Sequence, residues 1–235
     1  MVYVKVAVLF SGGKDSVFAV FCCLYKGWEV ELLTIEPAEY STMFHHPNVK
    51  WCELQAKAMG LPIRMVKATG ESEKDELVAM KGALAKMNVD GVAAGAIESE
   101  YQKERVDRIA HELGIRSFPP VWRTGDALLE EQCRYFETYV VAVAAEGLGK
   151  DELGAKFDAA FVEKVRKMRP VVSAHLEGGE GETFTAWAPF FEKRIGIKKI
   201  EKEYDGTRGI ARISGARLSW PVSRGVARIS DGRSS

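Results

Sequence analysis

Apolar and polar positions follow two different spacings along the first half of the chain. Apolar runs of strand length lie at 4–10, 28–35, 62–66, 91–96 and 118–122. Between them, the stretches 16–26, 49–59, 72–87 and 101–113 have helical spacing, and a glycine directly follows three of the four. Strands that alternate with helices predict βαβ units with right-handed crossovers. We therefore expect an α/β domain whose mostly parallel five-stranded sheet is covered by helices on both faces.

The pattern changes after residue 123. Helical spacing is found at 125–135 and 153–168, whereas 139–144, 183–187, 194–204 and 209–218 have the pattern of strands. We expect residues 1–123 to form the first domain and 124–218 to form a smaller α+β domain. Residues 219–235 are mostly small or charged, and we expect a tail whose removal costs little stability.

A glycine-rich loop follows the first strand and leads into the first helix, with the sequence Ser11, Gly12, Gly13, Lys14, Asp15 and Ser16. Backbone N–H groups in such a turn, together with the positive end of a helix, bind anions. The two glycines allow a sharp turn and a close approach of phosphate oxygens, and Lys14 adds a positive charge. A Walker A loop is excluded, because its glycine and its hydroxyl residue would fall at Val8 and Asp15. The dinucleotide pattern GxGxxG is absent as well.

The six loop residues resemble the SGGxDS loop of the PP-loop ATP pyrophosphatase superfamily, whose domain has a Rossmann-like (PP-loop or HUP) fold. In that superfamily the loop holds the β- and γ-phosphates of ATP as a unit, and the bond between the α- and β-phosphates breaks. The resemblance implies that AMP is transferred to a substrate oxygen and that pyrophosphate leaves. It also implies a catalytic role for Asp15.

Three more stretches resemble one branch of this superfamily, the diphthine–ammonia ligases (diphthamide synthetases) of archaeal type. They are YSTMFH at 40–45, GAIESEYQ at 95–102 with Arg105 one turn later, and EGGEGET at 177–183 followed by APFF at 188–191. The third motif of the family normally begins with another glycine, where this chain has Leu176. Members of the family make the amide of diphthamide on translation elongation factor 2 from diphthine, ammonium and ATP. The resemblance therefore implies an amide-forming carbon–nitrogen ligase that uses ATP and Mg²⁺.

Carboxylates of the third motif are the main candidates for the amide-forming step. A carboxylate accepts an amine only after its oxygen has become a good leaving group, and adenylation provides one. Glu177, Glu180 and Glu182 could then hold ammonium, take a proton from it, or hold a magnesium ion with waters. Glu180 and Glu182 are two positions apart and would share a face of an extended segment.

Other residues of the motifs are expected to bind ATP or the acceptor. Ligands of open α/β sheets lie at the carboxyl ends of the strands, which places ATP beside Gly95, Ala96 and Ile97. The expected substrate-binding residues are Ser99, Tyr101, Gln102, Arg105, Gly178, Gly179 and Thr183.

Composition limits the partners. The formal net charge is zero, so the protein lacks an overall positive charge that would attract nucleic acid, and we expect no stable binding to it. No apolar run approaches the roughly 18 residues of a membrane-spanning helix, and we expect a cytoplasmic protein with elongation factor 2 and ammonium as partners. Two alternatives remain: a PP-loop enzyme that adenylates a tRNA base, and a regulatory domain that binds ATP without chemistry. The four cysteines form no CxxC pair, which disfavours the first, and EGGEGET disfavours the second.

Overall fold

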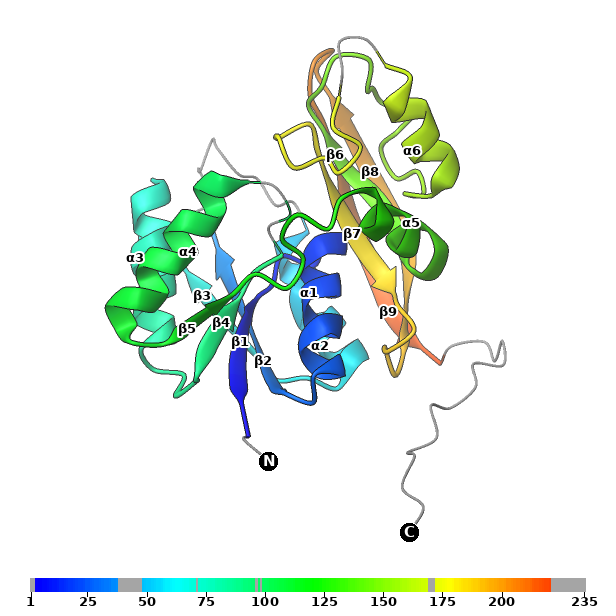
Figure 1. Ribbon diagram of the computed structural model, residues 1–235. Coiled ribbons are helices and arrows are strands. Elements are labelled where there is room, and N and C mark those ends of the chain that lie inside the picture. The colour runs from blue at the N-terminus through cyan, green and yellow to red at the C-terminus, as the bar shows by residue number, and fades with distance from the viewer. Residues whose placement is uncertain are drawn as a thin grey trace.

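A five-stranded parallel sheet forms the centre of the first half of the protein. The computed structural model describes residues 3–37, 48–70, 72–95, 97, 99–168 and 172–220, and Figure 1 shows their arrangement. The strands run in the order β3-β2-β1-β4-β5, and every neighbouring pair is parallel. Their bounds are Lys5–Leu9 (β1), Glu29–Glu36 (β2), Ile63–Lys67 (β3), Gly91–Ala93 (β4) and Arg116–Phe118 (β5). The strand order reverses between β1 and β4, and a ligand of such a sheet binds at the carboxyl ends of the strands there.

Helices cover both faces of this sheet, as the alternating pattern predicts. Helices α3 (Glu73–Leu84) and α4 (Glu100–Leu113) lie on one face, and α1 (Lys14–Tyr25) and α2 (Cys52–Met59) lie on the other (Figure 1). A short 3-10 turn, η1 (Val49–Trp51), leads into α2. Among the described residues, no helix combines the length and the apolar character needed to cross a membrane.

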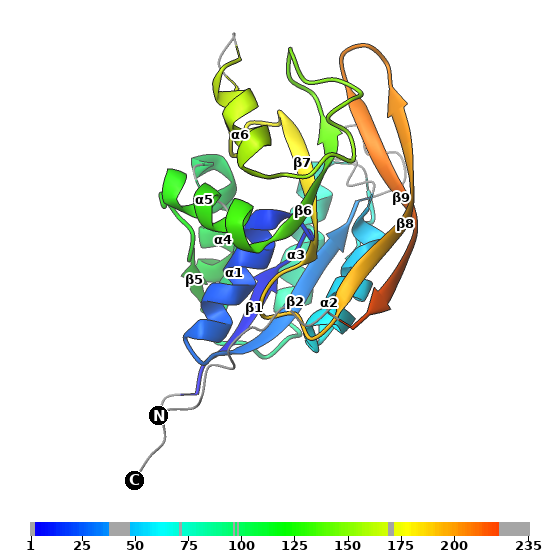
Figure 2. The same ribbon diagram turned by 90° about the vertical axis from the view of Figure 1, so that its right-hand side faces the viewer.

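The second half of the protein builds a four-stranded sheet of order β7-β6-β9-β8 in which the paired strands are antiparallel. The strands are Glu137–Val143 (β6), Gly181–Trp187 (β7), Arg194–Tyr204 (β8) and Gly209–Ser219 (β9). Helix α5 (Asp126–Tyr135) precedes this sheet, and α6 (Ala159–Arg166) lies near its far end (Figure 2). The α/β class with an additional α+β layer is therefore confirmed.

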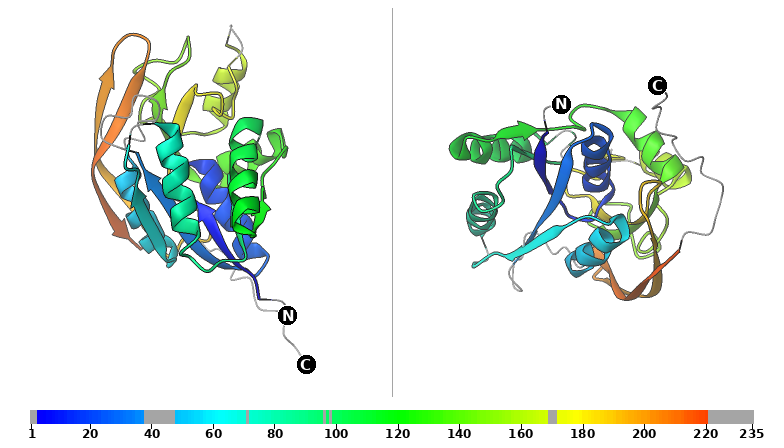
Figure 3. Two further views of the ribbon diagram at one scale, coloured as in Figure 1. Left: turned by 90° about the vertical axis from the view of Figure 1, so that its left-hand side faces the viewer. Right: turned by 90° about the horizontal axis from the view of Figure 1, so that it is seen from below.

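The two halves pack together through α1 and α2, which lie between the sheets (Figure 3). One continuous hydrophobic cluster contains side chains of β1, α1 and α2 together with side chains of β6, β7 and β9. Buried polar side chains also cross this boundary. Asn48 donates to the carbonyl of Ala211 at 3.0 Å and accepts from the amide of Ile213 at 2.8 Å, and Trp51 Nε1 donates to the carbonyl of Ile213 at 2.9 Å.

The fifth strand, β5, lies earlier in the chain than the apolar pattern predicts. The strand ends at Phe118, where the prediction had it begin. Pro119 and Pro120 have no N–H group to donate to a neighbouring strand, so the apolar run cannot continue the sheet. The segment that follows forms turns, in which Trp122 donates its backbone N–H to the carbonyl of Pro119 at 3.2 Å.

The helix predicted at 153–168 forms only in its second part. Gly154 has a φ of +72°, which a helix does not allow, and Lys156 pairs with Tyr139 in an isolated β-bridge. Helix α6 begins after Asp158, whose carboxylate accepts the amide hydrogen of Phe161 at 3.0 Å. At the end of the chain, β9 reaches Ser219, one residue into the predicted tail, and residues 221–235 lie outside the described residues.

Candidate functional site

The glycine-rich loop lies directly after β1 and forms the amino end of α1. Gly12 has a φ of +79°, and a side chain there would also overlap Oε1 of Gln55. Gly13 is the N-cap residue and offers no side chain to the first amides of α1. Ser11 Oγ donates to Ser16 Oγ at 3.3 Å, and Ser16 Oγ donates to the Gly13 carbonyl at 3.0 Å. These bonds fix the loop with the positive helix end directed toward the sheet edge where a ligand is expected.

The segment after β4 touches this loop. A Cβ atom at Gly95 would lie 2.7 Å from the carbonyl carbon of Asp15 and 2.7 Å from the amide nitrogen of Ser16. Only glycine allows such close contact between the two backbones. Ile97 is fully buried, and its amide donates to Oε1 of Glu177 at 2.8 Å. Ala96 lies outside the described residues.

The EGGEGET motif forms a turn at residues 177–180, here called the glutamate turn, and the start of β7. It lies beside the glycine-rich loop of residues 11–16, here called the phosphate loop after the ligand that we expect for it. Thr183 Oγ1 accepts the amide hydrogen of Lys14 at 3.1 Å, so this hydroxyl caps α1 from the second half of the chain. Leu176 precedes the turn with a φ of +59°, the left-handed region that glycine tolerates best. The family's glycine at this position therefore has a conformational reason, and this chain instead buries a leucine there, 6% exposed.

The three glutamates of the motif have different surroundings. Glu177 reaches the segment after β4, as described above, and Glu182 lies on β7. Glu180 precedes the strand and accepts two backbone amides of its own loop, that of Gly178 at 2.6 Å and that of Ser173 at 3.4 Å. Glu180 and Glu182 are expected to share a face only if the segment between them is extended. Because Glu180 lies in the turn, that condition is not met.

Lys14 points into the protein. Its side chain is 1% exposed, and Nζ donates to Asp15 Oδ2 at 2.6 Å and to the His175 carbonyl at 2.7 Å. The ammonium group also lies 5.4 Å from the ring centroid of Phe157. In this arrangement Lys14 joins the phosphate loop to the segment that carries EGGEGET. The sequence predicts only that Lys14 contributes a positive charge for phosphate, and it does not predict this contact.

A cavity of about 660 Å³ lies where these segments meet. Most of the predicted site residues line it: Ser11, Gly13, Lys14, Asp15, Ser16, Gly95, Ser99, Tyr101, Gln102, Arg105, Glu177, Gly178, Gly179, Glu182 and Thr183. Gly12, Ile97 and Glu180 are outside its lining. Gly12 and Ile97 support the walls through their backbones, and Glu180 closes the glutamate turn.

The predicted residues on α4 form the far wall of the cavity. Ser99 is the N-cap of α4 and accepts the amide hydrogen of Gln102 at 3.3 Å. Arg105 stacks on the ring of Tyr101, 3.0 Å from its centroid, and pairs through Nε with Glu73 Oε1 of α3 at 2.8 Å. The Tyr101 hydroxyl donates to the other oxygen of Glu73 at 2.7 Å. These three side chains join α3 to α4 at the rim of the cavity.

Sequence reasoning missed two buried glutamines that hold the phosphate loop. Gln55 on α2 donates from Nε2 to the carbonyls of Gly12 and Thr185, both at 2.8 Å. Gln132 on α5 donates from Nε2 to Asp15 Oδ1 at 2.8 Å. Both side chains are fully buried. A signal existed, because each glutamine stands among apolar residues on the buried face of its helix, where a polar side chain needs a reason.

The cysteine thiols are poorly suited to chemistry. Burial raises the pKa of Cys52 to about 12 and that of Cys23 to about 12. Cys133 follows Gln132 on α5, and burial, helped by the charge of Asp158, raises its pKa to about 11. Thiols with such pKa values are almost entirely protonated at neutral pH and react slowly as nucleophiles.

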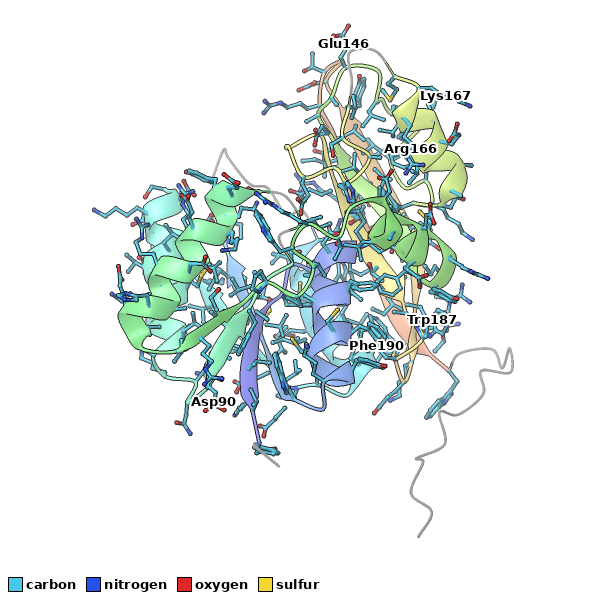
Figure 4. The ribbon with its side chains drawn as sticks, viewed as in Figure 1. Asp90, Glu146, Arg166, Lys167, Trp187 and Phe190 are labelled. Carbon is cyan, nitrogen blue, oxygen red and sulfur yellow. The ribbon has the colours of Figure 1, made fainter. Side chains whose placement is uncertain are left out.

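Two of the motif stretches contribute nothing to the described cavity lining. Residues 40–45 lie outside the described residues. In the APFF stretch, Phe191 is part of the core, and Phe190 packs on Phe21 of α1 with 5.9 Å between ring centroids. Figure 4 shows Phe190 beside α1 and Trp187 near the end of β7. This stretch therefore fastens the β7–β8 connection to α1.

Comparison with known proteins agrees with this geometry. The family profile described as diphthamide synthase N-terminal domain matches residues 4–117, and the profile described as diphthamide synthase C-terminal domain matches residues 124–218. The diphthine–ammonia ligase of Homo sapiens is 32% identical over 84% of this chain and 84% of that protein. The proteins of the same name from Danio rerio and Rattus norvegicus are 32% and 28% identical, over 84% and 92% of this chain and 88% and 91% of theirs.

A solved structure described as a predicted subunit of tRNA methyltransferase from Methanocaldococcus jannaschii aligns with a TM-score of 0.43 at 20% identity. The alignment covers 57% of this chain and 77% of that one, and a similarity at this level carries no functional argument. The family profiles, in contrast, match both halves of the chain in order, and the relatives match along most of their own length. The chain therefore belongs to the diphthamide synthase family.

Proposed function

We propose that this carbon–nitrogen ligase amidates diphthine on translation elongation factor 2, with ammonium as the nitrogen source and ATP as the activating nucleotide. One observation carries the proposal: the phosphate loop, the backbone at Gly95 and the glutamate turn line a single cavity of about 660 Å³. An activating nucleotide and an acceptor carboxylate must meet in one site, because an activated acyl group that has to leave it is lost to hydrolysis. The names of the relatives support the same reaction.

The proposed reaction has two steps. A carboxylate oxygen of diphthine attacks the α-phosphorus of ATP and forms a P–O bond. The bond between the α-phosphorus and the oxygen that bridges to the β-phosphorus breaks, and pyrophosphate leaves. Ammonium then gives a proton to a base, and the resulting ammonia attacks the acyl carbon. The C–N bond forms, the C–O bond to AMP breaks, and the nitrogen loses one more proton. The product is the neutral amide.

The residues of the cavity suit these steps. The positive amino end of α1, whose N-cap Gly13 has no side chain, and the hydroxyl of Ser11 can hold the phosphates that leave as pyrophosphate. Glu182 faces the same cavity and is the carboxylate that we assign to the ammonium or its proton. Glu177 holds the backbone at Ile97, and thereby keeps the wall after β4 in contact with the glutamate turn.

Magnesium suits this donor set as a companion of ATP. Among the residues that the structure describes, no group of three or more His, Cys, Asp or Glu side chains forms a metal site. Mg²⁺ commonly uses one or two carboxylates together with substrate phosphates and waters. If Glu182 does not bind the ammonium, it is the cavity carboxylate that would hold the ion. The ion would neutralise charge on the phosphates.

The proposal is tested by incubating the protein with elongation factor 2 that carries diphthine, with ATP, Mg²⁺ and ammonium, and by mass spectrometry of the modified peptide. Exchange of a hydroxyl for an amino group lowers the peptide mass by about one unit. AMP and pyrophosphate should appear in equal amounts with the amide. Accumulation of ADP and phosphate would overturn the proposed bond cleavage, and modification of a tRNA in place of the factor would overturn the proposed acceptor.

A further inference from the structure

The carboxylate of Asp15 is held from two sides by buried groups. Its Oδ2 accepts from Lys14 Nζ at 2.6 Å, and its Oδ1 accepts from Nε2 of Gln132 at 2.8 Å. The Asp15 side chain keeps 21% of its surface exposed and lines the cavity, whereas Gln132 is fully buried behind it. Gln132 therefore reaches the site only through Asp15.

Gln132 is an energetically unfavourable residue at its position. Within the described part of the chain, its Oε1 is buried and has no hydrogen-bond partner. The amide cannot turn around to correct this, because Oε1 would then face the Asp15 carboxylate, which only accepts hydrogen bonds when it is ionised. Leu128 and Leu129 share the buried face of α5, so an apolar side chain would suit the surroundings better. A buried donor that leaves its own acceptor unsatisfied indicates a role other than stability.

We infer that Gln132 is a positioning residue for the ATP-activation step of the proposed amidation. It fixes the orientation of the Asp15 carboxylate, which is part of the phosphate loop, without touching substrate. This inference rests on the proposed function.

The position of Gln132 in the chain gives this contact a further meaning. Helix α5 lies in the region matched by the C-terminal family profile, and Asp15 lies in the region matched by the N-terminal one. The phosphate loop is thus oriented by the part of the protein that also carries the glutamate turn. Lys14 makes the reciprocal connection, from the loop to the His175 carbonyl. ATP activation consequently depends on correct packing of residues 124–218 against the phosphate loop.

The test uses Gln132→Met, which keeps the length of the side chain and removes its polar atoms. The enzyme is supplied with elongation factor bearing diphthine, ATP, Mg²⁺ and labelled pyrophosphate, without ammonium, so that ATP–pyrophosphate exchange reports the activation step alone. We expect kcat of exchange to fall by about 10- to 100-fold, the loss typical of one hydrogen bond to a charged group. The KM for ATP should change little, and the melting temperature should stay the same or rise. Glu131→Gln, at the exposed neighbouring position of α5, is the matched control and should leave exchange unchanged.

A second variant, Gln132→Glu, keeps the shape and places a carboxyl against Asp15. Two adjacent carboxylates cannot both ionise easily, and a proton bound between them restores a donor. Charged groups around this part of α5 include Lys14 on α1, Arg166 on α6 and Asp158, each of which influences the pKa of the neighbouring Cys133. The pair binds its proton as the pH falls, so the ratio of variant to wild-type exchange rate should rise with acidification.

The outcomes separate the inference from the proposed function. If the wild-type protein shows no exchange with the diphthine-bearing factor, the proposed function fails. If the wild-type protein exchanges and Gln132→Met exchanges equally well, the positioning role is wrong. A fall in melting temperature with an unchanged exchange rate in the surviving folded protein would make Gln132 a purely structural residue and would also overturn the inference.

Discussion

Replacement of Glu182 by Gln is the change that most directly tests the proposed amide-forming step. The sequence places Glu177, Glu180 and Glu182 together, and their roles cannot be separated at that level. The structure distinguishes the surroundings of two of them. Glu182 lines the cavity, whereas the carboxylate of Glu180 accepts the backbone amides of Gly178 and Ser173. We therefore expect Glu182→Gln and Glu180→Gln to have different effects.

The magnitudes follow from these contacts. If Glu182 accepts a proton from ammonium, the side-chain amide of the introduced glutamine cannot do so, and amide formation should slow by about 10²- to 10⁴-fold. In Glu180→Gln, the remaining oxygen can keep the 2.6 Å bond to the Gly178 amide and loses the weaker 3.4 Å bond to the Ser173 amide. Exchange of a charged acceptor for a neutral one costs about 1 kcal/mol, so we expect a loss of about 10-fold or less.

Both steps of the reaction are measured for each variant, activation by ATP–pyrophosphate exchange and amidation by mass spectrometry of the factor. Glu182→Gln should leave exchange nearly intact and abolish most amidation. Glu146→Gln is a suitable control, since Glu146 is exposed, is not among the residues that line the cavity, and lies at the upper end of the second half in Figure 4. If excess Mg²⁺ restores much of the lost rate, Glu182 acts through the metal. Wild-type amidation by Glu182→Gln, or a larger loss in Glu180→Gln, would refute the assignment.

Other changes test the construction of the site. Gly95→Ala would place a methyl group 2.7 Å from backbone atoms of Asp15 and Ser16, and we expect ATP–pyrophosphate exchange to be lost while the protein stays folded by circular dichroism. Leu176→Gly should be no less stable than Leu176→Ala in urea titration, because glycine relieves about 1 kcal/mol of left-handed strain that alanine keeps; a glycine variant that is less stable by about 1 kcal/mol would contradict the observed φ. Truncation after Trp220 should change the melting temperature by less than about 2 °C, and a larger fall would show that residues 221–235 contribute to packing.

Local sequence patterns were sufficient for the parts of the site that are continuous in the chain. The apolar run of β1, the two glycines and the start of α1 are neighbours in sequence, so their arrangement follows from strand, turn and helix preferences alone. The position of Gly95 followed from the rule that ligands bind at the carboxyl ends of parallel strands. The meeting of the glycine-rich loop, GAIESEYQ and EGGEGET at one cavity depends on the strand order and on the packing of the second sheet against α1 and α2, which the spacing of the motifs does not determine.

Long-range partners could not be predicted in the same way. Gln132 is 117 residues from Asp15, and the His175 carbonyl is 161 residues from Lys14. Nothing in the local pattern distinguishes a lysine that contacts phosphate from one that donates to a distant carbonyl. The helix predicted from residue 153 shows a related limit, because a composition rich in helix formers is overridden by one glycine with positive φ and by the cap at Asp158.

The placement of α1 and α2 between two sheets determines how the protein must assemble. In most doubly wound domains a helix layer has water on its outer side, but here that side is sealed by β7, β8 and β9. A fragment cut near residue 123 would expose this apolar surface, together with the unpaired indole of Trp51 and amide of Asn48. We therefore expect the two halves to melt in a calorimeter as one cooperative transition, and neither half to be recovered as a monomer when expressed alone. The phosphate loop and the glutamate turn consequently form in the same folding event.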